Sequence, residues 1–141
     1  MVFNVNVVTS KHPLDCGATC LKMLLSYYNI EADLDVLRRQ LNTRLIGCTV
    51  KDLIDVGKIY GLDLKAYGNT KESMPVDDIF KQNRPAIIHW LYSHFCIYCG
   101  IDEDGKVVVI NPDRGRLKVS KGTFRSFFSC TSVWNGVPHD I

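Results

Sequence analysis

The chain contains 141 residues, of which 46% are hydrophobic and 23% are charged. This length suits a single domain, 1–141, that buries its own core, and the composition excludes intrinsic disorder. A formal net charge of +2, without a basic run, gives no electrostatic basis for a nucleic-acid partner. The sequence has neither a transmembrane-length apolar stretch nor a secretory signal, so we expect a cytoplasmic chain that reaches a membrane only through a partner.

The N-terminal third of the sequence has the apolar spacing of amphipathic helices. Three are predicted, over residues 16–28, about 33–41 and about 49–60. Asp15 precedes the first helix and Asn29 follows it, so both of its ends carry a residue suited to capping. Asp33 and Thr49 are the predicted N-caps of the second and third helices.

After Gly61 the pattern changes to the alternating or β-branched runs that are typical of strands. The predicted strands cover residues 62–67, 85–91, 94–101, 106–111 and 116–120. Short helices are predicted at 76–82 and after Ser120. Helices that precede an antiparallel meander predict an α+β fold, with the N-terminal helices packed on an antiparallel β-sheet.

The chain has six cysteines, at positions 16, 20, 48, 96, 99 and 130. Cys96 and Cys99 have the C-x-x-C spacing of a zinc knuckle or a redox pair. However, residues three apart on a strand point to opposite faces, so these two are predicted to be packing residues. The Cys and His residues form no closed ligand set, and we expect no metal and no organic cofactor.

Cys16 is the candidate for chemistry because it lies where the first predicted helix begins. Unpaired N–H groups and the helix dipole favour an anion at that end, which lowers the pKa of a thiol and favours the nucleophilic thiolate. Gly17 allows another chain to approach closely. Cys20, one turn further along, is expected to be a core residue.

A cysteine nucleophile needs a base, and His94 at the start of a predicted strand is the candidate. His89 precedes it by five residues and is expected to be structural, His12 is near Cys16 in sequence, and His139 is near the C-terminal end. An acceptor must hold the imidazole in place, and the sequence offers Asn111 and Asp113.

Three segments together resemble one family. They are DCGATCL at 15–21, PAIIHW at 85–90 with His-Phe at 94–95, and the Asn-Pro-x-x-Gly turn at 111–115. They resemble the double-glycine leader peptidases, the papain-like cysteine peptidase domains of bacteriocin-processing exporters. The resemblance covers nearly the whole chain, and it implies a papain-like fold.

Carried over to this sequence, the resemblance makes Cys16 the nucleophile and His94 the general base and acid. Asn111 stands where the family usually has Asp, and a side-chain amide oxygen can still fix the imidazole tautomer. Asp113 is out of register with that position. Ser10 stands where the family has a Gln that donates to the oxyanion. Ser10 is the candidate for this role, and Lys11 and His12 stay open as alternative donors beside the backbone N–H of Cys16.

The function implied is cleavage of a peptide after a Gly-Gly pair at the end of a leader. The implied partners are a peptide substrate with such a leader and an ABC-type exporter. The chain has no Gly-x-x-x-x-Gly-Lys-Ser/Thr motif, so it is not itself a full exporter. Two alternatives stay open: a weak or inactive relative that only binds a peptide or an exporter, and a papain-like acyltransferase.

Overall fold

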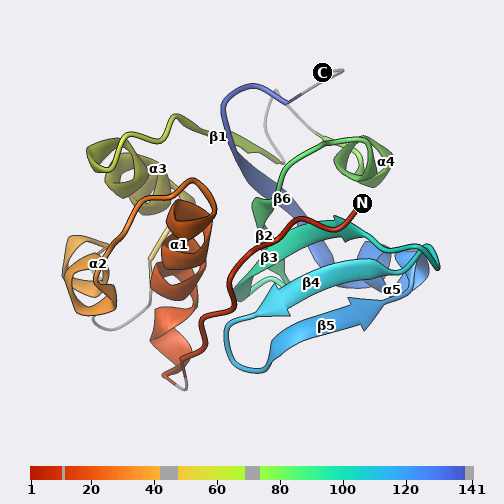
Figure 1. Ribbon diagram of the computed structural model, residues 1–141, viewed down its shortest axis with the longest axis horizontal. Helices are drawn as coiled ribbons and strands as arrows, with labels where there is room; N and C mark the ends of the chain where they lie inside the picture. Colours follow the sequence, from red (N-terminus) through yellow and green to blue (C-terminus); the bar gives the residue numbers. More distant parts are fainter. Residues whose placement is uncertain (11, 42–47, 69–73, 139–141) are drawn as a thin grey trace.

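The computed structural model describes residues 1–10, 12–41, 48–68 and 74–138. Three helices lie on one side of the molecule, and a twisted sheet with two smaller helices forms the other side (Figure 1). In chain order the elements are the 3₁₀-helix η1 (Pro13–Asp15), α1 (Cys16–Tyr27), α2 (Leu34–Gln40), α3 (Val50–Ile59), β1 (Leu64–Tyr67), α4 (Val76–Phe80), β2 (Ala86–Trp90), β3 (His94–Ile101), β4 (Val107–Asn111), β5 (Gly115–Val119), α5 (Lys121–Phe127) and β6 (Phe128–Asn135). This is the predicted α+β class.

The helix ends confirm most of the predicted caps. The side chain of Asp33 accepts two backbone N–H groups at the start of α2, and Thr49 forms a capping box with Asp52 at the start of α3. Asn29 follows α1 in the left-handed conformation, with φ of 62°, which is a usual way to end a helix. The prediction for Asp15 is wrong, because this residue occupies the N-cap position of α1 without a side-chain capping bond.

All neighbouring strands of the sheet are antiparallel, in the order β1-β6-β2-β3-β4-β5. Strands β2 to β5 form the predicted meander. Strand β6 was not predicted, because its sequence FSCTSVWN lacks a clear alternation and begins inside a Phe-rich segment that favours a helix. It runs between β1 and β2 and pairs with both of them, so its partners lie far away in the sequence.

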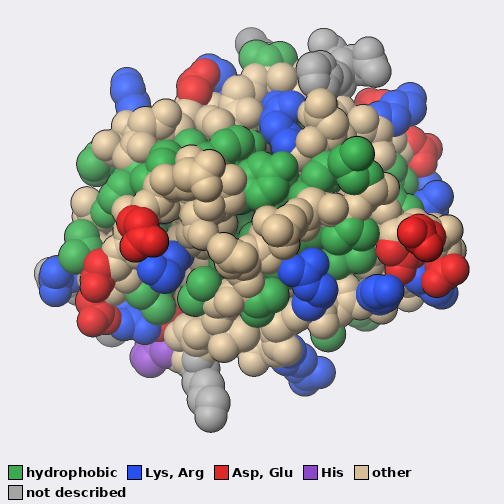
Figure 2. Space-filling model, viewed as in Figure 1, with side chains coloured by type: hydrophobic (Ala, Val, Ile, Leu, Met, Phe, Trp, Pro, Cys, Tyr) green, Lys and Arg blue, Asp and Glu red, His purple; other side chains and the backbone are tan. Residues whose placement is uncertain are grey.

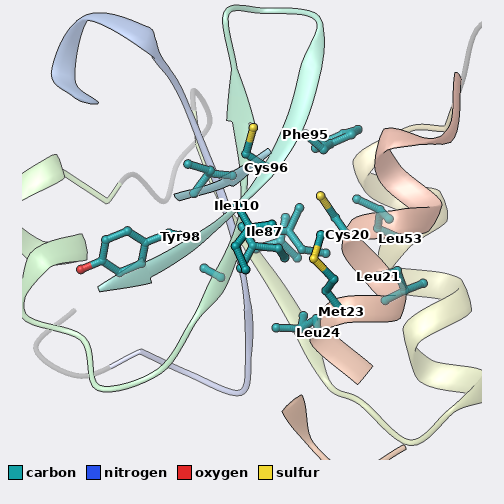
Figure 3. Close-up of a cluster of buried hydrophobic side chains, with 14 of the residues drawn as sticks. Cys20, Leu21, Met23, Leu24, Leu53, Ile87, Phe95, Cys96, Tyr98 and Ile110 are labelled. Atoms are coloured by element: carbon teal, nitrogen blue, oxygen red, sulfur yellow. The ribbon is translucent and has the colours of Figure 1, made fainter. Parts of the chain in front are cut away.

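Helix α1 packs on the sheet through a cluster of fully buried side chains (Figure 3). Leu21, Met23 and Leu24 of α1 are 0% exposed. Met23 and Leu24 point toward Ile87 of β2, whereas Leu21 points to the other side of the helix (Figure 3). Burial of one such side chain contributes about 1.5–3 kcal/mol to folding. Because this packing fixes α1 against the middle of the sheet, it also fixes the position of the residue that begins the helix.

The other face of the sheet packs against α5. Tyr98 points away from α1 in Figure 3, and its ring centroid lies 5.9 Å from that of Phe124 on α5. Phe124 also lies 5.5 Å from the ring of Trp90 and is fully buried. The sheet is therefore covered on both faces, which explains why β2 and β3 are mostly apolar, apart from His89 and His94.

The N-terminal segment crosses the sheet before the first helix begins (Figure 1). The backbone of Phe3 donates to Cys99 at 2.8 Å, and the carbonyl of Val5 accepts from Arg116 at 2.9 Å. The N–H of Ser10 then donates to the carbonyl of Pro112 at 2.9 Å. This segment brings the start of α1 to the turn between β4 and β5.

The face of the molecule drawn in Figure 2 has hydrophobic and uncharged groups over much of its middle. Lys and Arg side chains are interspersed with Asp and Glu along the edges of this face, so neither sign of charge dominates it. Within the described part of the chain, no helix has the length and apolar character needed to span a membrane.

Candidate active site

Cys16 is the first residue of α1, directly after the 3₁₀-helix, and it keeps 9% of its surface exposed. Its position at the helix start agrees with the sequence prediction. His12 belongs to the turn before it, where its Nδ1 atom accepts the backbone N–H of Leu14 at 3.2 Å. The ring of His12 therefore caps the 3₁₀-helix.

His94 begins β3, and its Nε2 atom lies 3.0 Å from Oδ1 of Asn111 at the end of β4. Its other ring nitrogen, Nδ1, is left for Cys16. A hydrogen bond with the Cys16 thiol raises the pKa of His94, against the opposing effect of burial, and Asn111 and the charge of Asp113 raise it further. The structure thus brings Cys16, His94 and Asn111 together as the sequence predicted.

Asp113 lies close to the same imidazole but makes a weaker contact. Its Oδ2 atom is 3.7 Å from Nε2 of His94, and its side chain is 47% exposed. The backbone N–H of Asp113 donates to Oδ1 of Asn111 at 2.9 Å, which fixes the amide oxygen toward the ring. Asn111 therefore holds His94 by a direct hydrogen bond, and Asp113 supplies a solvent-screened negative charge.

The hydroxyl of Ser10 points to Asp15. Its Oγ atom donates a hydrogen bond to Oδ2 of Asp15 at 2.9 Å. The same Oγ atom accepts a hydrogen bond from the backbone N–H of His12, at 3.4 Å. A hydroxyl has one proton to donate, and in this arrangement it is donated to a hydrogen bond with Asp15. Donation from Ser10 to an oxyanion would require this hydrogen bond to break. Lys11, an alternative donor in the sequence, lies outside the described residues.

Asp15 is buried beside Cys16 and paired with Arg38 of α2. Nε of Arg38 lies 2.8 Å and Nη2 lies 2.5 Å from Oδ2 of Asp15. Burial raises the pKa of Asp15, but hydrogen bonds from Arg38 and Ser10 and the charge of Arg38 outweigh it, so the pKa lies below its usual value. Sequence reasoning missed Arg38, because an arginine near the end of a helix is also typical of an exposed face.

The remaining cysteines lie away from this arrangement or are packed inside. Cys96 and Cys99 are fully buried, as predicted, and burial raises the pKa of Cys99 to about 12. Cys48 packs against Gly17, and burial raises its pKa to about 12. Among the described residues, no group of three or more Cys, His, Asp or Glu side chains is arranged to hold a metal ion.

His89 has the packing environment that the sequence predicted. Its ring centroid lies 5.2 Å from that of Phe95, and the planes are tilted by 33°. Burial and the charge of His94 both lower the pKa of His89, which favours its neutral form. His89 therefore differs from His94, whose pKa is raised.

The sequence is similar to parts of several bacterial export proteins. It is 26% identical over 134 residues to the colicin V secretion/processing ATP-binding protein CvaB of Escherichia coli, covering 94% of this chain and 18% of that protein. It is 28% identical over 128 residues to the transport/processing ATP-binding protein ComA of Streptococcus pneumoniae, covering 88% of this chain and 17% of that protein. The chain therefore spans less than a fifth of the length of these relatives.

The fold is similar to solved peptidase structures. A double-glycine motif protease from an AMS/PCAT transporter, solved in complex with its leader peptide, has a TM-score of 0.85 at 25% identity, covering 94% of this chain and 91% of that one. The peptidase domain of Streptococcus ComA has a TM-score of 0.80 at 20% identity, covering 93% and 97%. The family model of the peptidase C39 family matches residues 4–134, nearly the whole sequence. This chain belongs to the peptidase C39 family.

Proposed function

We propose that this chain cleaves a leader peptide after a double-glycine motif, with Cys16 as nucleophile, His94 as general base and acid, and Asn111 as the residue that orients His94. The observation that carries the proposal is the placement of His94, with Nε2 on Asn111 and Nδ1 left for the Cys16 thiol. The similarity to a double-glycine motif protease with a bound leader peptide supports the choice of substrate.

The proposed reaction has two stages. Nδ1 of His94 takes the proton of the Cys16 thiol, the thiolate attacks the carbonyl carbon of the second glycine, and the carbonyl oxygen takes the negative charge. The C–N bond then breaks as Nδ1 of His94 gives its proton to the leaving amine, which leaves a thioester on Cys16. His94 next removes a proton from a water molecule, and the resulting hydroxide breaks the thioester and releases the leader.

The negative charge on the carbonyl oxygen needs hydrogen-bond donors. The backbone N–H of Cys16 lies at the start of α1, where helical N–H groups have no partner within the helix. The hydroxyl of Ser10, the sequence candidate for a second donor, donates its hydrogen bond to Asp15 instead. Loss of one such donor typically costs about 10²–10³ in rate, so we expect slower turnover than a site with both donors would reach.

We propose that selectivity for glycine rests on steric exclusion. A narrow slot beside the thiol that leaves no room for a Cβ atom accepts glycine and rejects other residues. The amphipathic leader would bind separately, as a helix in an apolar groove. Because relatives of this chain are secretion and processing proteins with an ATP-binding part, we propose an ABC-type exporter as partner and the cytoplasmic side of a membrane as the location.

One observation favours a second candidate function, a domain that binds the leader without cutting it efficiently. The Ser10 hydroxyl donates to Asp15, so in this arrangement it does not supply the oxyanion hydrogen bond that the family obtains from Gln. A domain that retained the thiol and imidazole but lacked a complete oxyanion site would still bind peptide.

The deciding experiment follows cleavage of a synthetic Gly-Gly leader peptide by mass spectrometry. Cys16→Ala is compared with Cys130→Ala, which removes an exposed thiol elsewhere in the chain. We expect cleavage by the parent chain and by Cys130→Ala, and none by Cys16→Ala. Leader binding by all three proteins without cleavage supports the binding domain instead. A product extended by an added amine would identify an acyltransferase.

A further inference from the structure

We infer that Ser129 is a positioning residue for His94: its hydroxyl holds the turn at residues 91–93 in the conformation from which β3 begins. The effect on peptide cleavage rests on the proposed function, whereas the effect on the position of His94 does not. Ser129 lies on β6 and takes no part in the proton transfers of the proposed reaction. It acts through the backbone of the turn.

The turn between β2 and β3 has an unusual backbone. Leu91 and Tyr92 have φ of 52° and 62°, in the left-handed region that glycine adopts freely and bulky residues rarely adopt. The two residues are 52% and 82% exposed, so little side-chain packing holds them in this conformation. Two consecutive residues of this kind persist only where the surrounding structure fixes their backbone.

The start of β6 fixes this backbone through two hydrogen bonds. The N–H of Leu91 donates to the carbonyl of Phe127 at 2.8 Å, and the N–H of Tyr92 donates to Oγ of Ser129 at 2.6 Å. Oγ of Ser129 in turn donates to the carbonyl of Phe127 at 3.5 Å. Ser129 is only 4% exposed, so water competes little for its hydroxyl. Ser129 is therefore the partner that holds the second left-handed residue of the turn.

An irregularity in β6 explains why a side chain, and not only the backbone, meets the turn. Ile88 and Trp90 of β2 are two residues apart, whereas the residues of β6 that pair with them are four apart. The surplus residues form a bulge in β6, and a bulge changes where the neighbouring side chains point. Next to this bulge the hydroxyl of Ser129 takes the place of a backbone carbonyl as acceptor for the turn.

The turn matters because His94 follows it directly. The backbone of His94 pairs with Trp90 across the turn, whereas the pairing of β3 with β4 runs from Ile97 onward. The turn and β2 therefore set where the backbone of His94 lies, and Asn111 orients its ring. A displacement of about 1 Å at a reacting group can cost about 10²-fold in rate. A turn that relaxed would move the imidazole relative to the Cys16 thiol.

The test follows the His94 ring by NMR titration, which needs no substrate. Ser129→Ala removes the acceptor, and Ser126→Ala makes the same change at an exposed serine of α5. The hydrogen bond with Cys16 is the largest cause that raises the pKa of His94. We therefore expect Ser129→Ala to shift the titration of His94 toward lower pH, in the same direction as Cys16→Ala. Ser126→Ala is expected to leave the titration unchanged.

The double variant Ser129→Ala/Tyr92→Asn tests whether Ser129 acts through the turn. Asn adopts the left-handed conformation more readily than Tyr, and position 92 is exposed enough to accept it. We expect the double variant to recover most of the parent titration of His94. A titration equal to that of Ser129→Ala alone would overturn the inference, as would a parent titration in a folded Ser129→Ala protein.

Folding is checked by circular dichroism for each variant. If Ser129→Ala does not fold, Ser129→Cys decides, because sulfur fills the same site but is a weak hydrogen-bond acceptor. A shift of the His94 titration toward lower pH in Ser129→Cys supports the inference, and a parent titration overturns it.

Cleavage assays on the same proteins test the link to catalysis. We expect Ser129→Ala to lower kcat by about tenfold or more with little change in KM, because the change acts on proton transfer by His94. If the parent chain cleaves no leader, the proposed function fails, but the titrations of His94 still decide the role of Ser129.

Discussion

The Nε2 atom of His94 lies 3.0 Å from Oδ1 of Asn111, and the same oxygen accepts the backbone N–H of Asp113 at 2.9 Å. Because that oxygen is an acceptor, Nε2 must carry the proton in the neutral ring. The unprotonated nitrogen is then Nδ1, which is available to take the proton of the Cys16 thiol. Asn111 therefore fixes which nitrogen of His94 is the base.

Replacement of Cys16 should lower the pKa of His94. The hydrogen bond with Cys16 is the largest cause that raises this pKa, and burial is the main opposing effect. In Cys16→Ala the hydrogen bond that raises the pKa of His94 is lost, while burial still lowers this pKa. Titration of the His94 ring by NMR in the parent chain and in Cys16→Ala measures the change, with Cys130→Ala as control. An identical titration in all three proteins would contradict the contact between thiol and imidazole.

The raised pKa of His94 also predicts how its contribution to stability depends on pH. A histidine whose pKa is higher in the folded than in the unfolded state stabilises the fold fully below its unfolded pKa, near 6.5. That contribution is lost as the pH rises through the folded value. The free energy of unfolding in urea should therefore differ most between the parent chain and His94→Gln at about pH 5.5. If the difference in the free energy of unfolding between the two proteins grows toward alkaline pH, the predicted upward shift of the His94 pKa is contradicted.

Asn111 and Asp113 should differ in their importance for turnover. Asn111→Ala removes the direct partner of His94, and we expect kcat to fall by about 10²-fold, the lower end of the usual contribution of general acid–base catalysis. Asp113→Ala should cost less, because its carboxylate is half exposed and 3.7 Å away. Asn111→Asp should retain activity and raise the pKa of His94. A larger loss in Asp113→Ala than in Asn111→Ala would reverse the assignment.

Ser10→Gln tests whether the oxyanion site lacks a donor. The longer amide side chain stands where the resembling family has Gln, and one added donor should raise kcat by at least about tenfold. Ser10→Ala is the matched control, because it also breaks the hydrogen bond to Asp15 but adds no donor. Equal kcat values for the two variants would mean that the backbone donors suffice.

Gly17 should not tolerate a larger side chain while Cys48 is present. A Cβ atom added at Gly17 would lie 2.1 Å from Sγ of Cys48. Although alanine favours a helix over glycine, we expect Gly17→Ala to lower the free energy of unfolding by about 1–3 kcal/mol through overpacking. Gly17→Ala/Cys48→Ala should be more stable than Gly17→Ala, as measured by urea unfolding. A single variant as stable as the parent would contradict the close contact.

The elements that the sequence predicted well are those with a local signal. The apolar face of α1, the N-cap residue Thr49 and the turn at 111–115 are all readable within a dozen residues. Strand β6 has no such signal, because it is a strand only by virtue of pairing with β1 and β2, which lie some 40 to 70 residues earlier.

The residues of the candidate site likewise divide into those with a local sequence signal and those without one. Cys16, His94 and Asn111 stand in segments that are recognisable in the sequence. The packing of α1 on β3 and the pairing of β3 with β4 bring the three side chains together. Arg38 could not be found this way, because its pairing with Asp15 depends on how α2 packs beside α1. The sequence predicts that the side chain of Asp15 caps α1, but this side chain binds Arg38 and Ser10 instead.

The position of β6 has a consequence for how the protein is made. Strands β1 and β2 each need β6 as a neighbour, and β6 ends at Asn135, close to the end of this sequence. During synthesis, which proceeds from the N-terminus, both strands leave the ribosome with an open edge. The complete sheet therefore cannot assemble until nearly all of these residues have been translated, and a prematurely terminated product lacks the strand that closes it.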